Sequence, residues 1–342
     1  MELDTLSTIE EIKKMDHSQG AAVQGVFVLK KKANKKAKND STYLSLEYGD
    51  RSGNFHAFCF GDNPIYPRLE SIDEGSPVFV SLTTGVYQGR FSPRLTETRV
   101  LSEDELANPE LSARLVETSL ENPEELWEDF QGFVDGIEHE GLRATVRLAI
   151  GEIEAGFRSS PAAISMHHAY RHGLLEHTVH MARVCKALLP LYAEVDPNVA
   201  MAGLLLHDIG KVIEYEGELS VSKSRTGILQ GHVVLGYRMA RKAGMVAKLD
   251  PDLLERLEHV ILSHQGELEW GAAAMAATPE AVFVSMIDNL DARMGMVQYA
   301  LRHRSEQKPF SDYLPGLKAP LLTEPIKDVE ITLEDLQDSL DL

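Results

Sequence analysis

Residues 204–212 read LLLHDIGKV, a stretch that places His207, Asp208 and Lys211 inside an apolar run. The leucine and isoleucine residues around them recur at helical spacing, so the stretch predicts a helix that packs into a core. An unpaired carboxylate at such a position costs on the order of several kcal/mol. A metal ion removes that cost, because the carboxylate and the imidazole both become ligands. The alternative is a buried ion network of the three side chains without a metal.

The order of these three residues also predicts what each one does. Neighbouring residues on a helix point about 100° apart, so His207 and Asp208 can face two different cations, with Asp208 between them. Lys211 follows Asp208 by three residues and lies on the same face. It is expected either to pair with the carboxylate or to meet a substrate phosphate.

Histidine is concentrated in one part of the chain, because nine of the thirteen histidines lie between residues 167 and 264. Several stand in apolar helical runs beside aspartate or glycine, which favours metal binding over scattered core or surface histidines. The predicted helices together supply four imidazoles and two carboxylates as candidate ligands: His177, His207, Asp208, His232, His264 and Asp288. This donor set suits a pair of first-row divalent cations.

Residues 21–101 have the alternating pattern of β-strands. Strands are expected at residues 21–32, 41–50 and 51–60, with two more within residues 76–101. Five short strands with turn signals between them predict a small Greek-key barrel of the OB kind. Aromatic residues in this region either stack nucleic-acid bases or fill the barrel core: Tyr43, Phe55, Phe58, Phe60, Tyr87 and Phe91.

The segment of residues 30–40, KKKANKKAKND, is predicted to form the loop between the first two strands. On an OB barrel this loop borders the groove that binds nucleic acid. Its lysines are therefore candidate contacts with a nucleic acid: Lys30, Lys31, Lys32, Lys35, Lys36 and Lys38. The alternative is a charged hairpin tip that serves solubility alone.

From about residue 103 the pattern becomes helical and continues to about residue 301. One helix is expected within residues 102–119 and two more within 122–160. The organisation predicted for the 342 residues is a β barrel at 1–102, a helical connector at 103–155, an all-α domain at 156–305 and an acidic tail at 306–342 that ends in a loose amphipathic helix.

Composition excludes several classes of protein. The two cysteines, Cys59 and Cys185, lack metal-type spacing, so neither a disulfide framework nor a zinc ribbon is expected. The sequence has neither the apolar centre of a signal peptide nor an apolar run of about 18 residues, which predicts a cytoplasmic protein without membrane contact. Residues 1–100 are electrically neutral, so the remaining residues carry the whole net charge of −19. A polyanionic substrate must therefore be bound locally, by a basic patch or by metal cations.

The ligand pattern resembles that of the HD-domain metal-dependent phosphohydrolases. His177, the His207–Asp208 pair and Asp288 follow their H…HD…D order, and His232 and His264 match the two further histidines of the branch that binds two metals. The segments FRSSPAAISMHHAYRHGLLEHTVHM (157–181), GHVVLGYRM (231–239), ILSHQGELEWG (261–271) and TPEAVFVSMIDNLDARM (278–294) are similar to the YhaM-type 3′-5′ exoribonucleases. The resemblance covers residues 155–300 strongly and the β region by architecture. One departure is His172–Gly173, where the family has two glycines.

This resemblance implies a fold of two parts, an OB-like β barrel followed by an all-α HD-domain bundle. It implies two divalent cations, with Mn²⁺ the expected metal and Fe, Co, Ni or Mg left open, held by the six ligands with Asp208 bridging. Asp208 and Lys211 are then the expected catalytic residues, Lys211 by stabilising the phosphate. Three further residues are candidate substrate contacts: His167, His168 and Trp270.

Each of those three has a second interpretation. His167 and His168 are equally consistent with donors to the ligands or with a helix start, and Trp270 with a residue that closes its loop. His180 and His259 are expected to be structural. Asp291 and Arg293 are expected to form a surface pair or a pair that supports a ligand.

Three functions remain in competition at this point. The first is a 3′-5′ exoribonuclease acting on single-stranded RNA, and on single-stranded DNA as a second polymer, that releases mononucleotides. The second is an HD phosphohydrolase of small nucleotides or cyclic dinucleotides, with the barrel used for regulation or assembly. The third is a nucleic-acid-binding adaptor with a degenerate HD domain, which the complete ligand set argues against. A homo-oligomer is compatible with all three.

Overall fold

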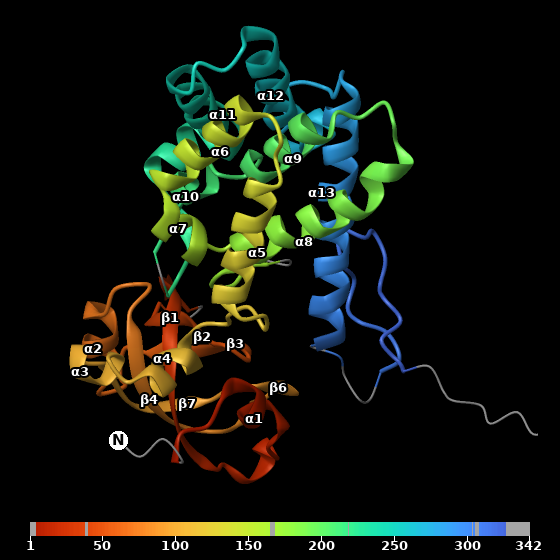
Figure 1. The fold of residues 1–342 in the computed structure, drawn as a ribbon. Helices are drawn as coiled ribbons and strands as arrows, with labels where there is room; N and C mark the ends of the chain where they lie inside the picture. Colours follow the sequence, from red (N-terminus) through yellow and green to blue (C-terminus); the bar gives the residue numbers. More distant parts are fainter. Residues whose placement is uncertain are drawn as a thin grey trace, which may run out of the picture. The chain divides into compact units, whose positions relative to one another are not determined.

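A computed structural model describes residues 5–37, 40–164, 168–217, 219–302, 304 and 308–325 of the chain. The chain divides into two compact units, residues 1–291 and 292–342 (Figure 1). No helix within the described ranges is long and apolar enough to cross a membrane.

The β region forms one five-stranded antiparallel sheet in the order β3-β2-β1-β4-β7. The two edge strands of this order, β3 and β7, lie next to each other, which closes the sheet into a barrel. The predicted small OB-like barrel is confirmed. Its strands are β1 (Ala22–Lys36), β2 (Thr42–Asp50), β3 (Gly53–Phe60), β4 (Pro77–Thr83) and β7 (Arg94–Val100), with a short hairpin of β5 (Val86–Tyr87) and β6 (Arg90–Phe91) before the last strand.

Strand β1 is longer than predicted. The prediction of a loop at residues 30–40 is therefore wrong for residues 30–36, which belong to the strand. The strand continues through Lys36, which pairs with Thr42 of β2. A register shift between Leu29 and Lys31 bends it, so its first half pairs with β4 and its second half with β2. The second half is polar on both faces, and a strand without apolar alternation gives no periodic signal. Lys38 lies outside the described residues.

Alternation along the strands separates the core of the barrel from its outer face. In β3, Phe55 and Cys59 point into the core, whereas Phe58 and Phe60 are about half exposed on the outside. Two short helices pack against the barrel core through buried aliphatic side chains. They are α1 (Ile9–Lys14), which begins with a capping box at Thr8, and α2 (Tyr66–Ser71).

The connector holds more helices than predicted. Two helices replace the one expected within residues 102–119, because Asn108 and the proline after it start a second helix. Three replace the two expected within 122–160. These five are α3 (Glu103–Leu106), α4 (Pro109–Leu115), α5 (Pro123–Asp135), α6 (Glu140–Gly151) and α7 (Glu154–Ser159).

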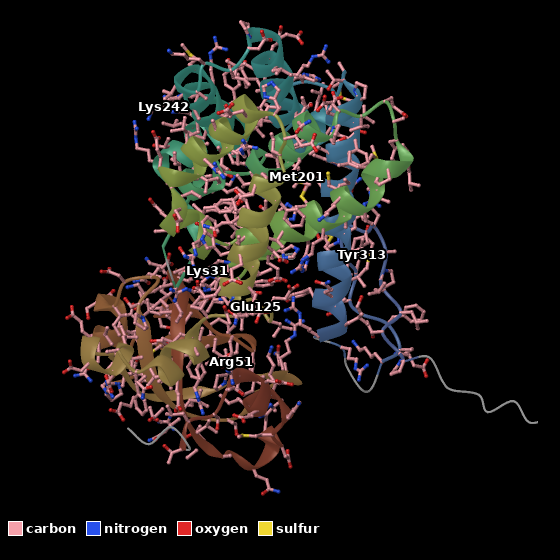
Figure 2. All side chains as sticks on the ribbon, viewed as in Figure 1. Lys31, Arg51, Glu125, Met201, Lys242 and Tyr313 are labelled. Carbon is pink, nitrogen blue, oxygen red and sulfur yellow. The ribbon has the colours of Figure 1, made fainter. Side chains whose placement is uncertain are left out.

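The remaining helices surround a second, larger apolar core, in which Met201 lies among the helices (Figure 2). They are α8 (Gly173–Leu188), α9 (Pro197–Leu206), α10 (Lys211–Glu214), α11 (Arg225–Val246), α12 (Pro251–Ser263) and α13 (Pro279–Arg302). A small hairpin of β8 (Tyr215–Glu216) and β9 (Ser222–Lys223), which the sequence did not predict, separates α10 from α11.

The segment LLLHDIGKV is not one continuous helix, which corrects the prediction. Helix α9 ends at Leu206 and α10 begins at Lys211, so His207 and Asp208 lie in the turn between them. Both are nevertheless buried, at 0% and 2% exposure. In the second unit, residues 308–325 form isolated bridges, Phe310 with Leu322 and Leu314 with Ala319. The helix predicted at the end of the acidic tail lies outside the described residues.

Candidate metal centre

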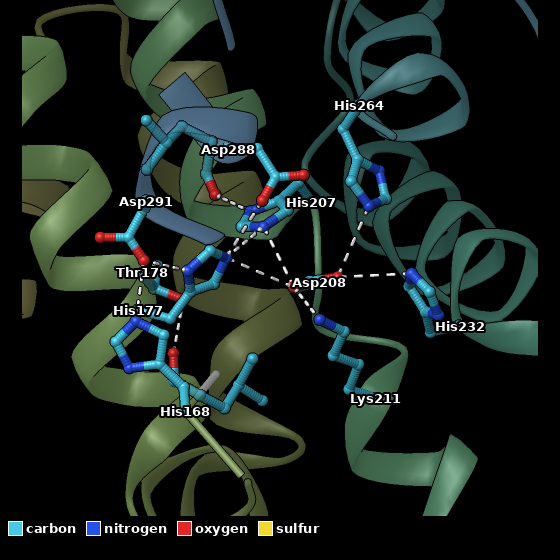
Figure 3. A network of polar contacts seen from close by, with 12 residues as sticks. His168, His177, Thr178, His207, Asp208, Lys211, His232, His264, Asp288 and Asp291 are labelled. Carbon is cyan, nitrogen blue, oxygen red and sulfur yellow. Dashed lines mark hydrogen bonds and ion pairs between the residues drawn. The ribbon is translucent and has the colours of Figure 1, made fainter. Parts of the chain in front are cut away.

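Asp208 lies at the centre of four histidines (Figure 3). Its Oδ2 atom is 3.6 Å from His177 Nε2 and 3.2 Å from His207 Nε2. Its Oδ1 atom is 3.5 Å from Nε2 of His232 and 3.5 Å from Nε2 of His264. Each carboxylate oxygen therefore faces its own pair of imidazoles.

Four helices, together with the turn between α9 and α10 that carries His207 and Asp208, bring these side chains together. His177 comes from α8, His232 from α11 and Asp288 from α13, while His264 directly follows α12. Asp288 Oδ1 lies 3.4 Å from His177 Nε2 and so completes the group. The structure thus places all six predicted ligands in one cluster.

Glycine allows the turn that carries Asp208 to approach α11. A Cβ atom on Gly210 would lie 2.0 Å from the backbone oxygen of His232 and 2.6 Å from the backbone nitrogen of Gly236. No side chain fits at that distance. Gly210 is therefore the contact point through which the turn and α11 set the spacing between Asp208 and His232.

Each of the four histidines is held through its Nδ1 atom. His207 and His264 contact backbone oxygens, of Leu204 at 2.6 Å and of Ile261 at 2.7 Å. His177 and His232 contact carboxylates, Asp291 Oδ2 and Glu214 Oε2, each at 2.7 Å. Because these oxygens accept hydrogen bonds, Nδ1 donates, and a neutral ring then presents the lone pair of Nε2 toward Asp208.

The charges of the centre are strongly coupled. Burial opposes ionisation of the Asp208 carboxyl, but Lys211 and His207 outweigh it and hold the pKa well below its usual value. The same balance, with His177 as the main partner, lowers the pKa of Asp288 to about 2. Burial opposes the charged form of His177, yet Asp288 and Asp291 raise its pKa to about 10. The cluster is thus an environment that stabilises positive charge.

The residues present fit divalent cations. Asp208 Oδ1 is buried and has no hydrogen-bond partner, although a buried carboxylate oxygen without a partner is costly. Asp208 belongs to two groups whose candidate ligand atoms lie within 4.8 Å of one another, one with His177 and His207 and the other with His232 and His264. Imidazole and carboxylate donors in this combination are typical of first-row divalent metals.

Lys211 contacts the same carboxylate. Its Nζ atom lies 2.5 Å from Asp208 Oδ2, and the side chain is 9% exposed. Of the two expected partners for Lys211, the carboxylate is therefore the one in contact.

The predicted substrate contacts are placed differently from one another. His168 is buried, with Nε2 at 2.9 Å from Asp291 Oδ2 and Nδ1 at 3.1 Å from the Tyr170 hydroxyl. Both ring nitrogens thus contact protein groups, which agrees with the second interpretation of His168, as a residue that contacts the supports of the candidate ligands. Trp270 is 51% exposed in the loop after α12. His167 lies outside the described residues.

Three residues near the ligands were missed or undervalued from the sequence. Glu214 holds His232, and Lys223 in turn holds Glu214 at 2.8 Å. Asp291, expected in a pair with Arg293 at the surface or in support of a ligand, contacts His177 and His168. Gln265 Nε2 lies 3.2 Å from His232 Nε2 and 2.9 Å from His264 Nε2. For Gln265, its position next to His264 was the available signal.

The model of the HD domain matches residues 174–293, which include all six candidate ligands. The 3′-5′ exoribonuclease YhaM of Bacillus subtilis (strain 168) is 30% identical over 289 residues, 84% of this chain and 90% of that protein. The chain belongs to the YhaM family.

Other YhaM proteins match over similar lengths. That of Shouchella clausii (strain KSM-K16) is 28% identical over 88% of this chain and 92% of its own. That of Listeria welshimeri is 28% identical over 90% of this chain and 96% of its own. The predictions of this family, of an HD domain and of an enzyme are confirmed. Membership in a family with an HD domain also implies dependence on a divalent metal.

Proposed function

We propose that the protein is a metal-dependent 3′-5′ exoribonuclease whose HD domain binds two divalent cations, with Mn²⁺ the expected metal. The observation that carries the proposal is the position of Asp208, which is shared by two groups of candidate ligands. The relatives that match along most of the chain are named 3′-5′ exoribonucleases. Hydrolysis of phosphodiester bonds in single-stranded RNA, and in single-stranded DNA as a second polymer, would release mononucleotides.

The roles of the ligands follow from their geometry. One cation would be held by the group around Asp208 Oδ2, and the other by the group around Oδ1: His177, His207 and Asp288 for the first, His232 and His264 for the second. When bound, such a pair of metals activates a water and neutralises the phosphate. Asp208 fixes the separation of the two groups, and the Nδ1 contacts keep the imidazoles aimed at it.

Lys211 is the proposed catalytic cation of the protein itself. Its ammonium group is held at Asp208, next to the position where the phosphate must lie if the ligands are to act on it. A fixed positive charge in a site largely closed to water stabilises the negative charge that develops on phosphate oxygens. The histidines and Asp208 then serve binding, and Lys211 serves the transition state.

The outer face of the barrel offers a surface for the RNA strand. The ring of Tyr43 lies 5.8 Å from that of Phe58 and 5.5 Å from that of Phe60. Lys35 pairs with Tyr43 in the strand register, so a cation flanks the rings. Exposed aromatic rings next to basic side chains bind single strands by stacking and charge.

The lysines of β1 differ in how available they are. Burial lowers the pKa of Lys30, and Lys32 Nζ donates to the backbone oxygens of Glu70 and Ile72. Lys31 forms an ion pair with Glu47 at 3.2 Å. Lys35 and Lys36 are exposed. Among the predicted lysines that the structure describes, these last two are therefore the proposed contacts with the RNA backbone.

In this proposal residues 1–102 bind the RNA strand and residues 156–305 hydrolyse its phosphodiester bonds. Residues 103–155 connect these two domains, and residues 306–342 form a tail. The test incubates the protein with Mn²⁺ and 5′-labelled single-stranded RNA, and in parallel with cyclic dinucleotides and nucleoside triphosphates. A ladder that shortens stepwise from the 3′ end is expected. Turnover of the small nucleotides alone would support the phosphohydrolase alternative and overturn the proposal.

Variants test the assignment of the centre. Asp208→Ala is expected to abolish hydrolysis while the protein stays folded by circular dichroism. Asp135→Ala, at an exposed carboxylate paired with Arg147 on the surface, is the matched control and should keep full activity. Full activity of Asp208→Ala would show that the metal centre lies elsewhere.

A further inference from the structure

A second cluster of candidate ligands lies behind His177. It consists of Glu176 and His180, which are four residues apart on α8, and Glu121, which precedes α5. One ligand atom from each of the three lies within 4.8 Å of those of the other two. None of the three belongs to the six ligands around Asp208.

Glu176 has one carboxylate oxygen without a hydrogen-bond partner. The residue is 6% exposed, and its Oε1 atom accepts a hydrogen bond from the Tyr170 hydroxyl at 3.0 Å. Its Oε2 atom is buried without a hydrogen-bond partner. A buried carboxylate oxygen in this state is costly unless a cation or a donor reaches it.

His180 lies between two carboxylates. Its Nδ1 atom faces Asp291 Oδ1 at 3.7 Å, and its Nε2 atom faces Glu121 Oε1 at 2.5 Å. Asp291 therefore lies between His177, which its Oδ2 contacts, and His180. At 3.7 Å the contact of Asp291 with His180 Nδ1 is an ion pair and not a hydrogen bond, unlike its 2.7 Å contact with His177 Nδ1.

Both oxygens of the Glu121 carboxylate have partners. Arg183 donates to Oε2 at 2.9 Å and to Asp129 at 2.8 Å, while Oε1 lies 2.5 Å from His180 Nε2, so a cation bound between these last two atoms would replace their contact. The side chains of Glu121 and His180 are 40% and 20% exposed, so a hydrated ion can reach them from solvent. The cluster thus combines a buried ligand, Glu176, with two ligands that solvent can reach, Glu121 and His180.

We propose that Glu121, Glu176 and His180 bind a further divalent cation, separate from the centre around Asp208. Two carboxylates and one imidazole suit Mn²⁺ or Zn²⁺, with water in the remaining positions. The cation gives the buried Oε2 atom of Glu176 a partner and links the segment before α5 to α8. Because Asp291 contacts both His180 and His177, the cation also helps to fix the position of His177 in the centre around Asp208.

The test measures bound metal directly, by equilibrium dialysis of the full chain against Mn²⁺, and separately against Zn²⁺, with elemental analysis. Glu176→Gln and His180→Ala are each expected to lose one equivalent relative to the unmodified protein. Glu125→Gln, an exposed glutamate in the first turn of α5, is the control and should lose none. Unchanged stoichiometry in both variants would mean that the cluster is an ion-pair network only, which overturns the proposal.

The same measurement on the Asp208→Ala variant distinguishes failure of this proposal from failure of the proposed function. Asp208→Ala protein is expected to retain one equivalent, which the additional change Glu176→Gln removes. If Asp208→Ala binds no metal at all, the further site does not exist. If Asp208→Ala binds as much as the unmodified protein, the centre around Asp208 is wrong, while Glu176→Gln still tests the cluster. Thermal melting of each variant confirms that it is folded.

Discussion

At the scale of single residues, the orientation of His177 depends on Asp291. The Asp291 carboxylate accepts a hydrogen bond from His177 Nδ1 at 2.7 Å and lies 2.9 Å from His168 Nε2. The other ring nitrogen of His168, Nδ1, contacts the Tyr170 hydroxyl. The whole chain of contacts is buried. The negative charge of Asp291 fixes the tautomer of the His177 imidazole and makes His177 Nε2 a better donor to a metal.

We therefore predict that Asp291→Asn weakens Mn²⁺ binding at the main centre by about 10–100-fold, the usual effect of losing such a partner. Isothermal titration with Mn²⁺ measures it, with Asp135→Asn as the control for a lost surface carboxylate. Binding of Asp291→Asn as tight as that of the control would refute the positioning role.

The sequence singled out the six clustered side chains more clearly than the residues that contact them. The His207–Asp208 pair and the histidines in apolar helices stand out because buried polar residues need a partner. Asp288 and Asp291 lie three residues apart on one helix, so their spacing alone does not tell ligand from support. That distinction depends on the rotation of α13 against α8, which packing of the whole domain decides.

At the scale of elements, close packing at glycine sets the geometry of the centre. Gly210→Ala would push the turn that carries Asp208 away from α11, because the new Cβ meets the backbone of His232 and Gly236. We expect a loss of about 1–3 kcal/mol in the free energy of unfolding, together with weaker Mn²⁺ binding. Urea unfolding and metal titration measure the two effects.

The matched control is Gly132→Ala in α5, where an added Cβ meets no atom within 4 Å. This change should stabilise the protein by up to about 1 kcal/mol, since alanine favours a helix over glycine. A Gly210→Ala protein as stable as the Gly132→Ala protein would show that the close approach is not needed.

Helix α3 begins with a charge that gives a pH-dependent contribution to stability. Hydrogen bonds from Arg99 and from the backbone of Ser102 lower the pKa of Glu105 to about 2, from 4.5. Because the folded pKa is the lower one, the contribution is present above pH 4.5 and is lost as the pH falls toward 2. The pair is partly exposed, so the effect is expected to stay below about 1 kcal/mol.

Unfolding of Glu105→Gln and of the unmodified protein should differ at pH 7 and converge toward pH 2. Glu103→Gln, at an exposed glutamate of the same helix, serves as the control for the loss of a surface carboxylate. A difference between Glu105→Gln and the unmodified protein that grows as the pH falls would contradict this account.

The elements themselves were predictable to different degrees. Strands with apolar alternation, such as β3, and helices with caps, such as α5, were predicted near their observed positions. The second half of β1 was not, because its stability comes from pairing with β2 and not from an apolar face. The break of LLLHDIGKV into two helices was also missed, since its apolar residues continue through the turn and a single glycine, Gly210, is tolerated inside a helical pattern.

At the scale of the whole molecule, a net charge of −19 makes binding of RNA depend on few basic residues. Changing Lys35 and Lys36 to glutamine is expected to weaken RNA binding and to reduce its salt dependence. The slope of log K against log salt should fall by about 0.7 for each lost phosphate contact. Fluorescence anisotropy with labelled single-stranded RNA at several salt concentrations measures it.

Lys242→Gln is the control for that experiment, because Lys242 points outward from α11 and pairs with Glu152 on the surface (Figure 2). An unchanged slope in the Lys35 and Lys36 variant would assign these lysines to solubility.

An anomalous difference map from crystals grown with Mn²⁺ shows whether Asp208 joins two metal sites. Two separate peaks are expected in contact with Asp208, one at Oδ2 beside His177 and His207, the other at Oδ1 beside His232 and His264. A single peak at this residue, or none, would contradict this expectation.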